Sequence, residues 1–91
     1  MTITKTDAIR RIEDQTPAAQ DALDRLSTEQ DLILRCRHVA RMDWGEVEEV
    51  VTETRREDRH TNNPHTRMAA RYTFALDAFI LAMDAVEREA A

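Results

Sequence analysis

Two histidines near the middle of the chain have the residue types that could bind a metal ion. His60 and His65 lie on either side of the turn at 62–64, and Glu57 and Asp58 precede them. Two imidazoles and a carboxylate are a ligand set that Zn²⁺ accepts. Helical zinc sites, however, place two histidines four residues apart, which this pair does not do. We therefore favour a polar loop between helices and expect no metal and no cofactor.

Two further pairs have side chains that act in catalysis elsewhere. Cys36 and His38 are two positions apart on an expected helix, so they point to different sides and cannot form a nucleophile and base. Asp77 and Asp84 share one side of a later helix, but no third ligand or base has a matching spacing. We interpret them as a polar seam that faces solvent or an arginine. With no phosphate-binding loop and no Ser/His/Asp arrangement, we expect no enzymatic activity.

Charge is more informative than these pairs, because it is segregated along the chain. The net charge of −5 is made of blocks that alternate in sign: −3 over 1–31, +3 over 32–42, −5 over 43–58, +3 over 59–76 and −3 over 77–91. An overall negative charge disfavours binding to nucleic acid or an anionic membrane. The chain is therefore expected to have a patterned surface with separate acidic and basic faces.

The strongest acidic block predicts a candidate binding surface. Glu46, Glu49 and Glu53 recur every three or four residues and form a ridge on one face of a helix, with Trp44 at its start. One interpretation is that these four residues bind a basic surface of a protein partner. The other is that neighbouring helices pair their opposite charges, which stabilises by about 0–1 kcal/mol per exposed pair.

The basic block supports a different hypothesis. The segments at 17–26 and 29–42 could form a helix-turn-helix in which Arg35, Arg37 and Arg41 contact DNA. Acidic flanking blocks and a turn without Gly count against this hypothesis. Nucleic acid is therefore a disfavoured partner, but this alternative stays open.

Composition indicates which elements must position these residues. The 91 residues include 13 Ala but one Gly and two Pro, so helix formers are abundant and turn residues are scarce. No stretch alternates with period two, and glycine-based hairpin turns are absent. We expect one all-α domain over residues 1–91, a compact bundle of four to five helices around a long, largely buried C-terminal helix.

Capping residues predict where the helices begin. Each expected start has a side chain that accepts a hydrogen bond from the first turn, and some add Pro or an acidic or amide residue just inside. The expected starts are Thr4 or Thr6, Thr16-Pro17, Ser27 with Gln30, Asp43 with Glu46, and Asn62-Asn63-Pro64. Apolar spacing continues through Pro17, so residues 4–26 could form one kinked helix or two helices.

The last helix, expected to run to about Glu89, has three apolar stripes. One contains Tyr72 and Phe79, a second contains Ile80 and Met83, and the third is Phe74, Ala78, Leu81 and Ala85. Four short helices can barely surround such a helix, so a second chain is the natural cover for the remaining face. We therefore expect a homodimer with an interface that includes Tyr72, Phe79, Ile80 and Met83; a monomer is the alternative.

The most apolar window is too short and too polar to cross a bilayer. It covers residues 74–86 and includes Asp77 and Asp84, whereas a span needs about 20 apolar residues. The first seven residues have no apolar run and do not resemble a secretory signal. We expect a cytoplasmic protein with no membrane partner.

These observations together favour a non-catalytic protein–protein interaction module. It would regulate or inhibit a macromolecular partner through the acidic ridge and Trp44. Small acidic helical proteins of phages and mobile elements often block the basic grooves of nucleic-acid-handling machines, and this role is a candidate by analogy. The alternatives are a dimeric helix-turn-helix regulator and a structural subunit of a larger assembly.

Overall fold

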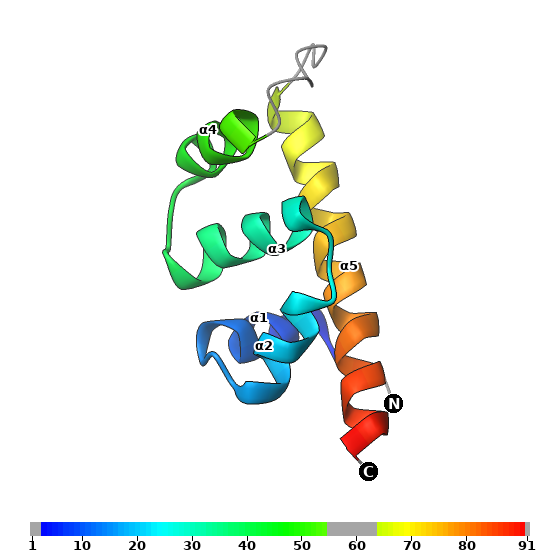
Figure 1. The fold of residues 1–91 in the computed structure, drawn as a ribbon. Helices are drawn as coiled ribbons and strands as arrows, with labels where there is room; N and C mark the ends of the chain where they lie inside the picture. The colour runs from blue at the N-terminus through cyan, green and yellow to red at the C-terminus, as the bar shows by residue number, and fades with distance from the viewer. Residues whose placement is uncertain (1–2, 55–63, 91) are drawn as a thin grey trace.

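The computed structural model describes residues 3–54 and 64–90, and within these ranges every regular element is helical (Figure 1). The elements in chain order are α1 (Lys5–Glu13), α2 (Pro17–Asp24), α3 (Thr28–Leu34), the π-helix η1 (Arg35–Val39), α4 (Trp44–Thr54) and α5 (Pro64–Ala90). The expected all-α fold with a long C-terminal helix is confirmed.

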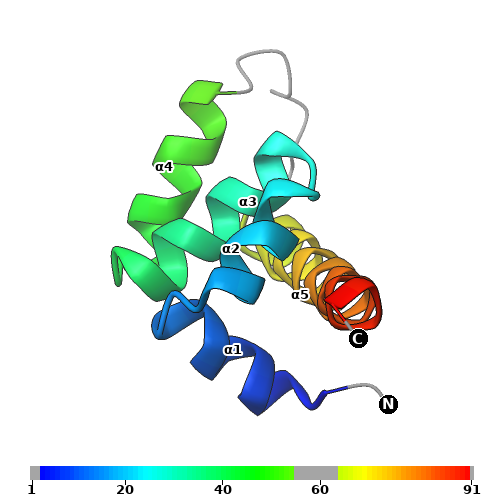
Figure 2. The ribbon, with the colours of Figure 1, turned by 60° about the horizontal axis from the view of Figure 1, so that its bottom comes forward.

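Helix α5 is the longest element, and the other helices pack along it. Figures 1 and 2 show α1 to α4 on one side of α5, so they cover that side without encircling the helix. Its closest neighbours are α2 and α3. One long face of α5 therefore has none of the other described helices upon it.

The expected capping signals form as hydrogen bonds at four of the five expected helix starts; Asn62 and Asn63, expected at the fifth, lie outside the described residues. Thr16 accepts from the amide of Ala19 at the start of α2, and Pro17 occupies the first helical position. Ser27 and Gln30 form a reciprocal capping box at α3. These helix starts could be predicted from the sequence, because each capping side chain binds backbone amides within one turn of itself. Thr4 likewise caps α1, through the amide of Asp7, and Asp43 with Glu46 opens α4.

Residues 4–26 form two helices rather than one kinked helix. Gln15, between α1 and α2, has φ 52°, a left-handed conformation that stops a helix. The amide of Thr16 donates to the carbonyl of Arg11 at 3.4 Å, which closes the end of α1. The break precedes Pro17, which then starts α2 without the loss of an amide bond.

The expected helix over residues 29–42 is shorter and changes type. α3 continues into η1, a single π-helical turn, and the chain leaves it at Arg41 with φ 57°. The amide of Met42 donates to the carbonyl of Cys36 at 3.0 Å, again the closing bond of a left-handed helix end. With Gly45 as the only glycine, the chain uses Gln15 and Arg41 at positions that glycine usually fills.

Two groups of buried side chains hold the helices together. Phe79, Ile12 and Leu23 are fully buried in the larger group, where α1, α2 and the C-terminal half of α5 meet. The smaller group contains Ile33, Cys36, Val47, Val51 and Met68 and attaches α4 to α3, η1 and the start of α5. Tyr72 packs against both groups. The position of α4 thus depends on the smaller group and on the residues around Tyr72.

Within the described ranges, no helix combines the length and the apolar content that crossing a bilayer requires.

Candidate functional site

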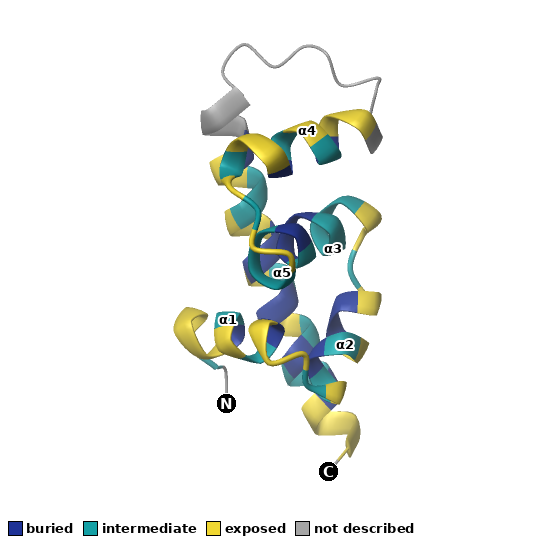
Figure 3. Ribbon diagram, turned by 90° about the vertical axis from the view of Figure 1, so that its left-hand side faces the viewer, coloured by how far each residue is buried: buried dark blue, intermediate teal, exposed yellow. Residues whose placement is uncertain are grey.

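The outward face of α4 has the densest set of carboxylates in the described chain. Glu46, Glu49 and Glu53 are exposed, while Val47 and Val51 on the opposite side are buried (Figure 3). We call the residues Glu46, Glu48, Glu49 and Glu53 the acidic face. Three residues of the acidic face, Glu48, Glu49 and Glu53, line an open hollow of about 650 Å³ together with Gly45 and Thr52.

The acidic face is not neutralised by the neighbouring basic helix. Ion pairs between described residues join Arg11 to Glu87, Arg25 to Asp21 and Glu89, Arg35 to Asp24 and Asp31, Arg71 to Glu29, and Arg88 to Asp84. None of these pairs includes a carboxylate of α4. Among the described residues, Glu46 contacts only its capping partner: its carboxylate accepts from the amide of Asp43 at 3.3 Å, and its own amide donates to Asp43 Oδ1 at 2.9 Å. Pairing between neighbouring helices does occur in this chain, but among the described residues it leaves α4 out.

Trp44 has a different environment from the carboxylates that follow it. Its ring meets the Tyr72 ring edge-on, with centroids 4.9 Å apart, and the Arg37 guanidinium lies 4.6 Å from its centroid. The side chain is half-buried and packs on the smaller core group. Trp44 therefore anchors the start of α4 to η1 and α5, as its bulk just after the cap allows, and it does not lie beside the carboxylates of the acidic face.

His38 and Tyr72 form a contact that joins η1 to α5. The His38 Nε2 and Tyr72 Oη atoms lie 2.7 Å apart, and both side chains are half-buried. Burial lowers the pKa of His38 and raises the pKa of Tyr72, so both groups favour the neutral form. Nearby charges act in both directions, since Glu13 raises the pKa of His38 and Arg37 lowers it. The pair is a structural link in which a proton-sensitive group lies next to the anchor of α4.

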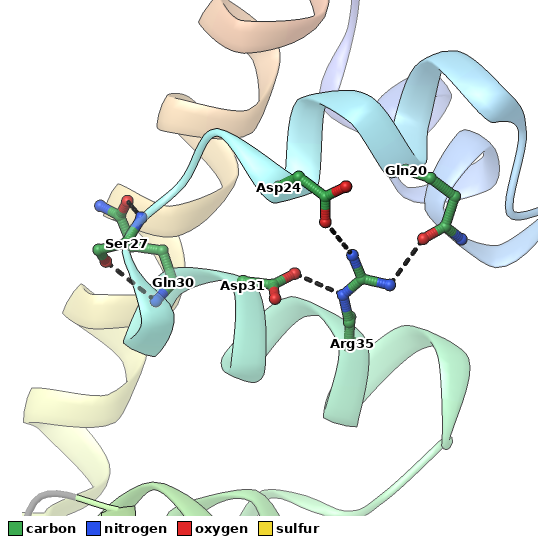
Figure 4. Close-up of polar contacts among 6 residues, drawn as sticks. All are labelled: Gln20, Asp24, Ser27, Gln30, Asp31 and Arg35. Carbon is green, nitrogen blue, oxygen red and sulfur yellow. Dashed lines mark hydrogen bonds and ion pairs between the residues drawn. The ribbon is translucent and has the colours of Figure 1, made fainter.

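Arg35, one of the three candidate DNA-contacting residues, is held by partners within the chain (Figure 4). Its Nε donates to Asp31, its Nη1 to Gln20 at 2.6 Å, and its Nη2 to Asp24 at 3.1 Å. These bonds tie α2 to the α3–η1 segment. The guanidinium would have to give up this network in order to contact a phosphate or a base.

The other two arginines of that hypothesis differ from each other. Arg37 donates from Nη1 to the carbonyl of Met42 at 2.8 Å and lies over the Trp44 ring. Arg41 is exposed, but it lies beyond the end of η1 in its left-handed conformation. The three side chains therefore do not form one recognition face along a single helix.

The expected homodimer interface requires a correction in its residues. Phe79, Ile80 and Met83 are buried inside the monomer, and half-buried Tyr72 contacts Trp44 and His38. They face the helices of their own chain because that face of α5 covers the larger core group. The third stripe is different: Phe74 is 67% exposed and Leu81 is 69% exposed. Any surface for a second chain on α5 has to use this stripe.

The structure describes only some of the candidate metal-binding and catalytic residues. His60 lies outside the described residues, as does the side chain of His65, so the structure does not place that pair. Elsewhere in the described chain, no group of three His, Cys, Asp or Glu residues could hold a metal ion. Cys36 is buried, and burial raises the pKa of its thiol. Asp77 is exposed, and Asp84 pairs with Arg88 at 2.7 Å, as expected for a polar seam.

No protein-family model matches the chain, and no curated protein and no solved structure shows significant similarity to it. Residues, contacts and charges of this chain are therefore the basis for a function.

Proposed function

We propose that the protein is a non-catalytic interaction module that binds a basic surface of a protein partner through the acidic face of α4. One observation carries this proposal. Glu48, Glu49 and Glu53 have no ion-pair partner among the described residues, although most other acidic blocks of the chain are paired. A charged face left unpaired is available to guide the approach of an oppositely charged partner.

Helix physics gives a second reason. Glu49 and Glu53 are four residues apart, a spacing at which like charges destabilise a helix by about 0.2–0.5 kcal/mol. This arrangement therefore costs folding stability. Such local conflicts are expected at functional surfaces, where they serve something other than the fold.

Regulation or inhibition of a nucleic-acid-handling machine stays part of the proposal, because such machines have the basic grooves that an acidic helix fits. A cytoplasmic location of the protein is likewise a prediction. The helix-turn-helix alternative has less support, since Arg35 and Arg37 are held by contacts within the chain. A structural subunit of a larger assembly is the remaining alternative. Its assembly surface would have to differ from the interface first expected on α5, which consisted of Tyr72, Phe79, Ile80 and Met83.

Quantitative affinity capture from cells that express the chain tests the proposal. The test variant is Glu49→Arg with Glu53→Arg, and the control is Glu13→Arg with Asp14→Arg, which makes the same charge change on exposed residues at the C-terminal end of α1. We expect the α4 variant to lose at least nine-tenths of a specifically captured partner while the α1 control retains it. Equal capture by both variants, each with the wild-type circular dichroism spectrum, would reject the acidic face as the binding surface.

A further inference from the structure

The exposed stripe of α5 alternates large and small side chains. Phe74 and Leu81 are the large apolar residues that the structure exposes most, and Ala70, Ala78 and Ala85 lie on the same side of the helix. Successive members are three or four residues apart, so they form one line along the helix. The helices α1 to α4 lie on one side of α5 (Figure 2), and the exposed Phe74 and Leu81 side chains place this line away from the core groups that those helices cover. A partner helix can therefore lie along α5 without displacing any helix.

We propose that a second copy of this chain covers the stripe, with the two α5 helices antiparallel. One register places Phe74 against the partner's Ala85 and Leu81 against the partner's Ala78. By the two-fold symmetry, the same contacts repeat in the other half of the interface. Each large side chain then fills the space left by a small one, the arrangement that lets two helices pack closely. This proposal is independent of the acidic face of α4.

Charge on the flank of the stripe favours this register. Arg88 reaches back to Asp84 at 2.7 Å, so its guanidinium lies one turn before its own Cα. In the proposed register, Asp77 lies two residues, about 3 Å along the axis, from the level of the partner's Asp84. Exposed Asp77 therefore lies beside the partner's Asp84–Arg88 ion pair, where the guanidinium can bridge the two carboxylates, and the contact occurs twice.

Other arrangements match less well. A parallel pair places each central residue beside its own copy, so Phe74 meets the partner's Phe74 and Leu81 meets the partner's Leu81. An antiparallel register with Phe74 opposite the partner's Leu81 also brings the two Asp77 residues together. Both arrangements place large side chains opposite each other in the middle, which the proposed register avoids.

The size of the surface sets the strength of the association. The stripe from Ala70 to Ala85 is about 22 Å long at about 1.5 Å per residue, and one helix face is narrow. An interface of this kind falls at the small end of specific contacts, where association is weak and transient. We therefore expect a reversible dimer that forms at high protein concentration.

Sedimentation equilibrium over a dilution series up to about 1 mM tests the pairing. The wild-type mass should rise from 10.5 kDa toward twice that value. Leu81→Arg, a change at an exposed site, should weaken dimerisation at least tenfold with an unchanged helical spectrum. The α4 double variant should dimerise like the wild type, which separates this proposal from the acidic face. A wild-type mass that stays at 10.5 kDa, or a dimer that Leu81→Arg leaves intact, would overturn the proposal.

Crosslinking tests the orientation in a Cys36→Ala background. A bismaleimide with a reach of about 8 Å should join two copies of Ala78→Cys, because residues 78 lie near the two-fold axis. It should not join two copies of Ala85→Cys, which lie about 16 Å apart along the axis in the antiparallel register. Efficient crosslinking of the Ala85→Cys copies would indicate a parallel pair and contradict the register.

Discussion

Replacement of Arg41 by glycine should stabilise the protein, although mutation to glycine usually has the opposite effect. Arg41 has φ 57° and ends η1 in the left-handed region. A non-glycine residue there costs about 1–2 kcal/mol, whereas glycine adopts this conformation freely. Glycine also makes the unfolded chain more flexible, which removes about 0.4–1 kcal/mol of the gain. The net effect is a stabilisation of about 0.5–1 kcal/mol.

Gln15→Gly should act in the same way, because Gln15 has φ 52° and an exposed side chain. The matched control is Arg10→Gly, at an exposed site with helical backbone in α1, where glycine should destabilise by about 1 kcal/mol. Urea denaturation measures these changes, and melting temperatures should shift by about 4–8 °C per kcal/mol in a domain of this size. If Arg41→Gly and Gln15→Gly destabilise as much as Arg10→Gly does, the assignment of these two helix ends is wrong.

Three further predictions concern the core, the His38 contact and a cap. Phe79→Ala should lower the free energy of unfolding in urea by about 3–5 kcal/mol, because the Phe79 ring is buried. Phe74→Ala should lower it by less than about 0.5 kcal/mol, because the Phe74 ring is exposed. Equal losses would contradict the orientation of α5. Burial lowers the pKa of His38, so the stability that its neutral form contributes is present above about pH 6.5 and is lost as the pH falls below that value. His38→Gln should therefore flatten the stability profile between about pH 7.5 and pH 5.5, and an unchanged slope would contradict the assignment. Ser27→Ala should cost about 1 kcal/mol, whereas exposed Thr28→Ala next to it should change little; a reversed order would exclude the capping box.

Helix starts were predictable because the information is local. Ser27 with Gln30 and Thr16 with Pro17 each satisfy amides within one turn, so the interaction partners are neighbours in the sequence. The helix ends were harder to predict. A left-handed residue is usually signalled by glycine, and here Gln15 and Arg41 have that conformation without the signal.

The orientation of α5 could not be deduced from its own sequence. Its three apolar stripes are nearly equal in content, so only the packing of α1 to α3 decides which of them faces inward. The sequence indicated that one face would remain for another chain, but it assigned Phe79 and Met83 to that face. Phe74 and Leu81 occupy it instead, because α1 and α2 pack against the side of α5 that contains Phe79.

The candidate site shows the same limit. Spacing alone placed Glu49 and Glu53 on one outward face, because residues four apart share a side of any helix. Trp44 was grouped with them by its position in the chain, yet its ring turns toward Tyr72. Tyr72 and His38 are 34 positions apart in the sequence, and no local sequence pattern predicts a contact across that separation.

The acidic face is tested most directly by a nuclear magnetic resonance titration with an octa-arginine peptide as the basic probe. We predict that amide shifts in the wild type concentrate on residues 45–53 of α4 and weaken as salt is added. Glu49→Arg with Glu53→Arg should abolish these shifts, whereas Glu13→Arg with Asp14→Arg should leave them in place. Shifts spread evenly over the acidic residues of all helices, or equal binding by the two variants, would contradict a specific basic-partner surface on α4.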